Sequence, residues 1–209
     1  MLSSTQFNNL CREKLDLYFK KVIFLVLLAA PKRINEFRAI SISKSILTEH
    51  EARLTTHAGF MKKNATATFN PVTLPVPAYP SNNTLCPIYN LNQYCQITEQ
   101  ICQNKNIQRP DQLFIKENGL PFTTHQLRSA VREIIIRADP LAPKESHTFH
   151  NVRKLASTLL DYRGFSLQQI MEKMEWKSSQ TYLTYYCQLG LVEKNFRSCI
   201  IAGVTLPST

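Results

Sequence analysis

Apolar residues recur at helical spacing over most of the chain, a pattern that predicts a mainly helical protein. Residues 13–30 become wholly apolar towards their end, so we expect a helix that ends before Pro31 and whose second half is buried on all sides. Apolar stripes, prolines and capping residues predict further helices over 87–104, 124–138 and 148–160, one after Ser166, and a last one from Ser178 or Ser179.

Three short segments between the first two of these helices favour β-strands instead. They are residues 37–43, 52–56 and 68–76. Prolines at 71, 75 and 77 limit the third segment to the edge of a sheet, because proline cannot donate to a neighbouring strand. The predicted fold class is therefore α+β, mainly helical with a small antiparallel three-stranded sheet.

The charge of the chain narrows the choice of partner. Its 209 residues include 25 Lys and Arg against 15 Asp and Glu, which gives a formal net charge of +10. Such a balance favours a polyanion, either nucleic acid or an anionic membrane surface. The apolar run of residues 22–30 is too short to cross a bilayer, so we interpret it as a buried helix and expect no membrane partner.

The six cysteines show neither a C-x-x-C pair nor a pairing with His at zinc-finger spacing. The sequence therefore predicts no structural metal site and no disulfide framework. We interpret the cysteines as reduced thiols of an intracellular protein.

Basic and aromatic residues follow one another in a series that suits chemistry on a phosphodiester. Arg33 and Glu36 come just after the first apolar helix, and His150 and Arg153 share one helical face three residues apart. An arginine fork can bind two phosphate oxygens at once, and a tyrosine hydroxyl can carry a phosphoryl group covalently.

Further candidates complete this series. The segment Gly-Phe-Met-Lys-Lys over 59–63 lies between the second and third strands. Trp176 follows Glu175, and three tyrosines come soon after, at positions 182, 185 and 186. In order and separation, all these segments resemble the catalytic boxes of tyrosine recombinases of the phage integrase type. They look closest to the recombinases of DIRS- and Ngaro-type retroelements.

The resemblance covers about residues 15–190. It implies an N-terminal extension over 1–14, a tyrosine recombinase catalytic domain over 15–190 and a C-terminal tail over 191–209. Family members usually precede this domain with a helical core-binding domain. We therefore expect the chain to be a fragment, a truncated element or one product of a longer polyprotein.

The same resemblance assigns roles to individual residues. Arg33 and Arg153 would clamp the non-bridging phosphate oxygens, and His150 would assist proton transfer. The remaining roles fall to Lys63 as the acid for the leaving oxygen, Trp176 as an indole donor, Glu36 as the residue that orients Arg33, and Tyr186 as the nucleophile.

Two of these assignments have alternatives. Lys62 remains open beside Lys63. Counting nine residues from Trp176, the spacing usual in phage and bacterial members, selects Tyr185, whereas the retroelement pattern T-F-x-x-F-Y selects Tyr186, which we favour. One departure concerns Glu175, which stands where the family usually has glycine or another small residue, so its carboxylate would repel a phosphate unless it points away.

The implied function is metal-independent DNA cleavage and rejoining through a 3′-phosphotyrosyl intermediate, in the recombination or integration of a mobile element. It needs no cofactor and no small-molecule substrate. The implied partners are double-stranded DNA and further copies of the chain on that DNA, in the nucleus of a eukaryotic host or otherwise in the cytoplasm. The alternatives are an inactive or domesticated DNA-binding module of the same fold and a type IB topoisomerase.

Overall fold

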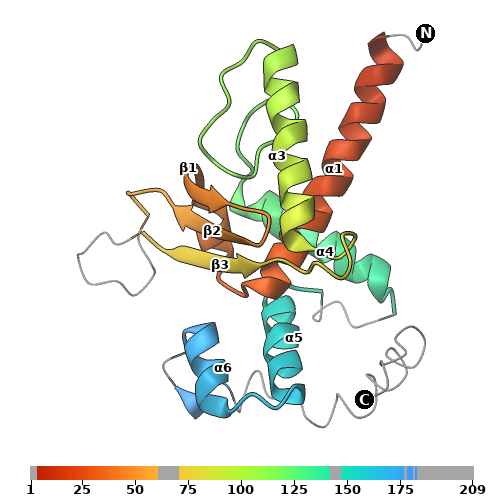
Figure 1. Ribbon diagram of the computed structural model, residues 1–209. Coiled ribbons are helices and arrows are strands. Elements are labelled where there is room, and N and C mark those ends of the chain that lie inside the picture. Colours follow the sequence, from red (N-terminus) through yellow and green to blue (C-terminus); the bar gives the residue numbers. More distant parts are fainter. Residues whose placement is uncertain (1–3, 61–70, 142–146, 177, 181, 183–209) are drawn as a thin grey trace. The chain divides into compact units, whose positions relative to one another are not determined.

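The computed structural model describes residues 4–60, 71–141, 147–176, 178–180 and 182 (Figure 1). The chain forms two compact units, residues 1–151 and 152–209. The first contains α1 (Ser4–Ala29), α2 (Ile34–Arg38), β1 (Ile40–Leu47), β2 (Glu51–Thr56), β3 (Thr73–Pro77), α3 (Pro87–Asn104), α4 (Thr124–Ala138) and the start of α5 (Phe149–Tyr162). The second contains the rest of α5 and α6 (Leu167–Met174).

The helical part of the first unit largely follows the predicted pattern. α3 and α4 have the predicted bounds, and Thr123 caps α4 by accepting from the backbone N–H of Gln126. α1 begins at Ser4, nine residues before the predicted start. Its second half is only partly enclosed, since Phe24, Leu25 and Leu28 are half-buried and Ala29 is exposed. Among the described residues, no helix is both long enough and apolar enough to cross a membrane.

The predicted start of the first strand, at residue 37, was wrong. Residues 34–38 form the short helix α2, and β1 starts only at Ile40. Phe37, which the sequence predicts in the strand, lies in this helix and is fully buried. β3 starts at Thr73, whereas the strand was predicted from residue 68. Residues 68–70 lie outside the described part of the chain.

The sheet is three-stranded and antiparallel in the order β1-β2-β3, as predicted, and the proline-containing β3 occupies an edge. β1 bulges between Ser41 and Ile46, where its register against β2 shifts. The hydroxyl of Ser45 fills the gap by accepting from the backbone N–H of Thr55. Asp111 fastens the other side of the bulge, because its carboxylate accepts hydrogen bonds from the Ser41 hydroxyl and the Ser43 backbone N–H.

An aromatic cluster joins α1 to α3 and to the loop before α4. The ring of Phe19 stacks on Phe122 with centroids 3.8 Å apart and meets Phe114 edge-on at 6.0 Å. Behind it, the buried hydroxyl of Tyr94 donates to the carbonyl of Ile115 at 2.8 Å and accepts from the N–H of the same residue at 2.9 Å. One side chain of α3 thus fixes a loop that follows it in the chain.

We predict that Tyr94→Phe destabilises the protein by about 1–3 kcal/mol, because it leaves a buried backbone N–H and carbonyl without their partner. Urea denaturation followed by far-UV circular dichroism measures the change. Tyr89→Phe is the matched control, since Tyr89 lies on the same helix with 45% of its surface exposed. Equal stability of the two variants would contradict the structural role of the Tyr94 hydroxyl.

Candidate functional site

The turn between α1 and α2 presents Arg33 at the surface. Pro31 cannot continue α1, and Arg33 itself has an extended backbone, with φ −77° and ψ 148°. The carboxylate of Glu36 accepts a hydrogen bond of 2.6 Å from the backbone N–H of Arg33, and the N–H of Glu36 donates back to the Arg33 carbonyl at 2.9 Å. Glu36 therefore fixes the main chain of Arg33, while the Arg33 side chain stays exposed.

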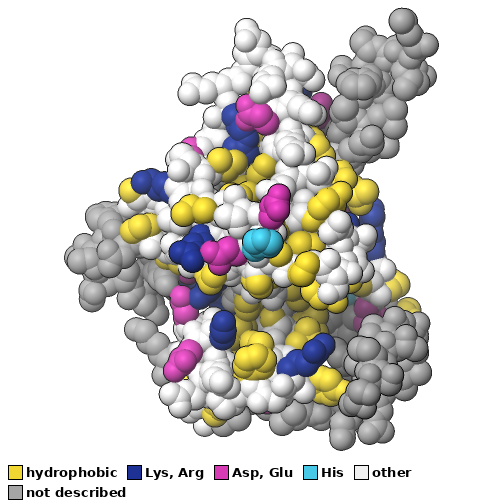
Figure 2. Space-filling view, viewed as in Figure 1, with side chains coloured by type: hydrophobic (Ala, Val, Ile, Leu, Met, Phe, Trp, Pro, Cys, Tyr) yellow, Lys and Arg dark blue, Asp and Glu magenta, His cyan; other side chains and the backbone are white. Residues whose placement is uncertain are grey.

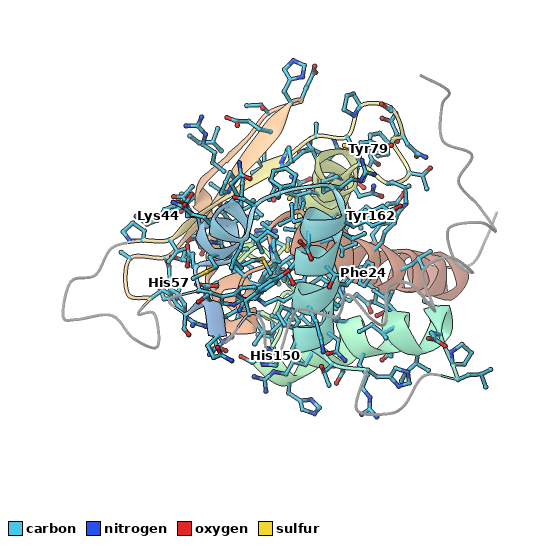
Figure 3. The ribbon with its side chains drawn as sticks, turned by 90° about the horizontal axis from the view of Figure 1, so that it is seen from below. Phe24, Lys44, His57, Tyr79, His150 and Tyr162 are labelled. Carbon is cyan, nitrogen blue, oxygen red and sulfur yellow. The ribbon has the colours of Figure 1, made fainter. Side chains whose placement is uncertain are left out.

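α2 also contacts the beginning of α5. The rings of Phe37 and Phe149 meet edge-on, with centroids 5.9 Å apart, and both are buried. His147, just before α5, is buried as well, and its Nε2 lies 3.2 Å from the carbonyl of Asp139. A carbonyl can only accept, so this Nε2 carries the proton. His150 follows on the first turn of α5 and is exposed (Figure 3).

Arg153 lies in the second unit and is buried, with 5% of its surface exposed. Its Nη2 donates to the backbone carbonyl of Met174 at 2.9 Å, and its guanidinium carbon lies 5.8 Å from the centre of the Trp176 ring. Trp176 in turn packs on Tyr182, with ring centroids 5.4 Å apart. The sequence placed Arg153 beside the buried residues of its helix and did not predict that it is buried itself.

Glu175 provides the sharp end of α6. Its φ of 54° and ψ of 44° lie in the left-handed region, and the N–H of Trp176 reaches back to the Met171 carbonyl at 3.0 Å. This is the geometry in which helices usually end on glycine. The left-handed backbone gives a physical reason for a glycine at this position. In this chain the position holds Glu175, which is exposed.

Several predicted site residues lie outside the described residues, namely Lys62, Lys63, Tyr185 and Tyr186. Of the last predicted helix, residues 179, 180 and 182 are helical. Within the first unit, the structure connects the turn of Arg33 with the first turn of α5, where His150 lies. Within the second, it gathers Arg153, Trp176 and Tyr182.

The sequence did not predict a hollow of about 420 Å³ in the first unit. It is lined by Asn35 and Arg38 of α2, by His57 and Phe60 after β2, and by Gln112 and Pro121. Arg38 carried no signal, because it lay within residues 37–43, which were interpreted as a strand, and belonged to none of the motifs.

Arg109 is a second basic residue that the sequence did not single out. Its Nη1 donates to the Pro110 and Gln112 carbonyls, and its Nη2 donates to Thr98 Oγ1 and to the Leu113 carbonyl. This arginine therefore organises a loop. On the face seen in Figure 2, basic side chains are interspersed with acidic and apolar ones. In the described part of the chain, no group of His, Cys, Asp and Glu is placed to hold a metal ion.

Comparison with known proteins adds a family and a fold. The family model described as "Phage integrase family" matches residues 4–190. The structure is similar to that of XerA recombinase, with a TM-score of 0.59 and 16% identity over 88% of this chain and 62% of that one. It is also similar to XerH site-specific recombinase bound to difH substrate in a pre-cleavage complex, with a TM-score of 0.56 and 15% identity.

The XerH match covers 93% of this chain and 52% of that chain. The protein thus spans between about half and three fifths of the length of these two recombinases. At identities this low, the two matches show a shared fold alone. A search of the curated proteins gives no match.

We predict that Arg153→Ala destabilises the second unit, because it removes a buried hydrogen bond to the Met174 carbonyl and the cation beside Trp176. The expected loss is about 1–3 kcal/mol. Trp176 is the only tryptophan of the chain, so urea denaturation followed by tryptophan fluorescence reports on this unit directly.

Arg33→Ala is the matched control for this experiment. It removes an exposed arginine from the other unit, so its effect should stay within about 0.5 kcal/mol. An Arg153→Ala variant with the fluorescence transition of the parent protein would show that the buried guanidinium does not stabilise the second unit.

Proposed function

Because the chain belongs to the phage integrase family, the family of the tyrosine recombinases, we propose that it cleaves and rejoins DNA through a covalent phosphotyrosyl intermediate. The observation that carries this proposal is the turn of Arg33. An exposed guanidinium stands there on a main chain that the buried Glu36 holds in place. A cation on a main chain that is fixed in advance needs less reorganisation to stabilise the charge of a phosphoryl transition state.

In the proposed reaction, the hydroxyl of Tyr186 attacks the scissile phosphorus. A bond forms between the tyrosine oxygen and phosphorus, and the bond from phosphorus to the 5′ oxygen breaks. Lys63 gives its proton to that leaving oxygen, and His150 assists the transfer of the tyrosine proton. The 5′ hydroxyl of a partner strand later attacks the phosphotyrosine and regenerates the enzyme. Because the bond energy stays in the phosphotyrosine, the reaction consumes no nucleotide.

Arg33 and Arg153 would hold the non-bridging oxygens, with Trp176 as a further donor. The contacts of Arg153 support this role, because the Met174 carbonyl and the Trp176 ring restrict the orientation of its guanidinium. A planar fork with a fixed orientation can bind two phosphate oxygens together, which a lysine cannot do.

The biological setting belongs to the same proposal. The net charge of +10 suits double-stranded DNA as the partner. Strand exchange between two sites requires several copies of the enzyme, so we expect self-association on DNA. The likeness of the motifs to DIRS- and Ngaro-type elements leads us to propose recombination or integration of a mobile element, in the nucleus of a eukaryotic host or otherwise in the cytoplasm.

One observation favours a second candidate, a DNA-binding module of the same fold without catalysis. Glu175 is exposed directly beside Trp176, and a carboxylate at this place would repel a phosphate. A type IB topoisomerase is the third hypothesis. Two assays, supercoil relaxation and recombination between two sites, distinguish a topoisomerase from a recombinase.

The decisive experiment traps the intermediate. We expect the protein to form a covalent complex with a pool of nicked duplexes of mixed sequence, in which the cleaved strand diffuses away and religation fails. Peptide mapping should place the adduct on Tyr186. Tyr186→Phe should abolish the adduct, because phenylalanine keeps the ring and removes only the nucleophile, whereas Tyr185→Phe should retain most of it.

An adduct on Tyr185 would show that the spacing from Trp176 outranks the retroelement pattern. The same assay includes Arg33→Ala, which should stay folded and lose the adduct. A protein that binds DNA but forms no adduct on either tyrosine would be the non-catalytic module.

We also predict that EDTA leaves formation of the adduct unchanged. The proposed chemistry takes its positive charge from two arginines and a lysine, so no metal ion is needed for the transition state. The measurement is the yield of adduct with and without chelator at constant ionic strength. Loss of the adduct in EDTA together with its recovery on addition of magnesium would point to another enzyme class.

A further inference from the structure

The hollow beside α2 has walls from four parts of the first unit that hydrogen bonds hold together. The N–H of His57 donates to the carbonyl of Ala39 at 2.9 Å, which joins the end of β2 to the end of α2. Thr124 Oγ1 donates to Asn35 Oδ1 at 3.2 Å, which joins the start of α4 to α2. The hollow is therefore part of the folded unit.

Its polar groups suit an anion. Arg38 and His57 are exposed in it, Asn35 and Gln112 add amides, and none of the described residues that line it is acidic. The imidazole of His57 meets the ring of Phe60 edge-on with centroids 6.3 Å apart, which restricts the orientation of the imidazole. Among the described residues, no carboxylate pairs with Arg38.

The position of the hollow relates it to Arg33. Arg33 precedes α2 and Arg38 is its last residue, so the two backbones lie about 7.5 Å apart along the helix at 1.5 Å per residue. Successive phosphates of one DNA strand advance about 3.4 Å along the duplex axis. Because successive phosphates also turn around that axis, they lie farther apart in space than this rise, so the phosphate next to one bound at Arg33 lies within reach of Arg38.

We propose that this hollow is a second phosphate-binding subsite, in which Arg38 and His57 bind the DNA backbone beside the scissile position. The inference rests on the proposed function, because it takes DNA as the ligand. Arg38 binds the backbone and does not touch the reacting atoms. It holds the duplex in register with Arg33.

The test measures how affinity for a short duplex of mixed sequence depends on salt. Each phosphate that a protein cation neutralises contributes about 0.9 to the slope of log K against log salt concentration. We expect Arg38→Gln to reduce this slope by about 0.9. Arg38→Lys should keep it, because a lysine still supplies the charge.

Arg53→Gln is the matched control. It removes the same charge from an exposed arginine of β2 that already pairs with Glu51, with Nε and Oε1 2.9 Å apart. We expect this variant to keep the parent slope. A slope for Arg38→Gln equal to that of the parent, or a loss of the same size in Arg53→Gln, would overturn the subsite.

Adduct formation on saturating DNA separates this inference from the proposed function. If the parent protein binds DNA with the expected slopes in its variants but forms no adduct, the catalytic proposal fails and the subsite stands. If the parent forms the adduct and Arg38→Gln keeps the slope, only the subsite fails. A parent protein without affinity for duplex DNA would overturn both.

Discussion

The hydrogen bond from the backbone N–H of Arg33 to the buried carboxylate of Glu36 fixes the start of α2, and the rest of the candidate site in the first unit follows from the place of that helix. A carboxylate with 2% of its surface exposed is costly to bury unless it is hydrogen-bonded, and here the bond closes the first turn of α2. α2 then places Phe37 in the core and Ala39 where its carbonyl receives the N–H of His57. The exposed arginine, the start of the sheet and the hollow thus depend on one short helix.

Sequence patterns succeeded where many apolar residues share one face. α3 and α4 have long stripes with proline or threonine at their beginning, so their extents could be predicted closely. α2 has five residues, too few for a period to show, and its buried Phe37 reads equally well as part of a strand. The bulge of β1 depends on Asp111, a partner 70 residues away from Ser41, which no local pattern reveals.

The candidate site shows the same division. The series Arg33, His150, Arg153 and Trp176 was assembled from order and spacing, and the roles of its members stay predictions. The burial of Arg153 could not be predicted from the sequence. Its partner is the backbone carbonyl of Met174, and any residue in that place would present the same group. The hollow of Arg38 and His57 arises from residues distant in sequence and was equally hidden.

The two arginines therefore face different evolutionary pressures. Arg153 lies buried against the main chain of another helix, so a substitution there harms folding, and selection for stability removes it. Arg33 is exposed, so under the proposed function only the need for DNA cleavage preserves it. Among related chains that had lost the proposed activity, Arg33 would then vary before Arg153. The order in which the two positions vary among related copies would then record whether activity or stability was lost first.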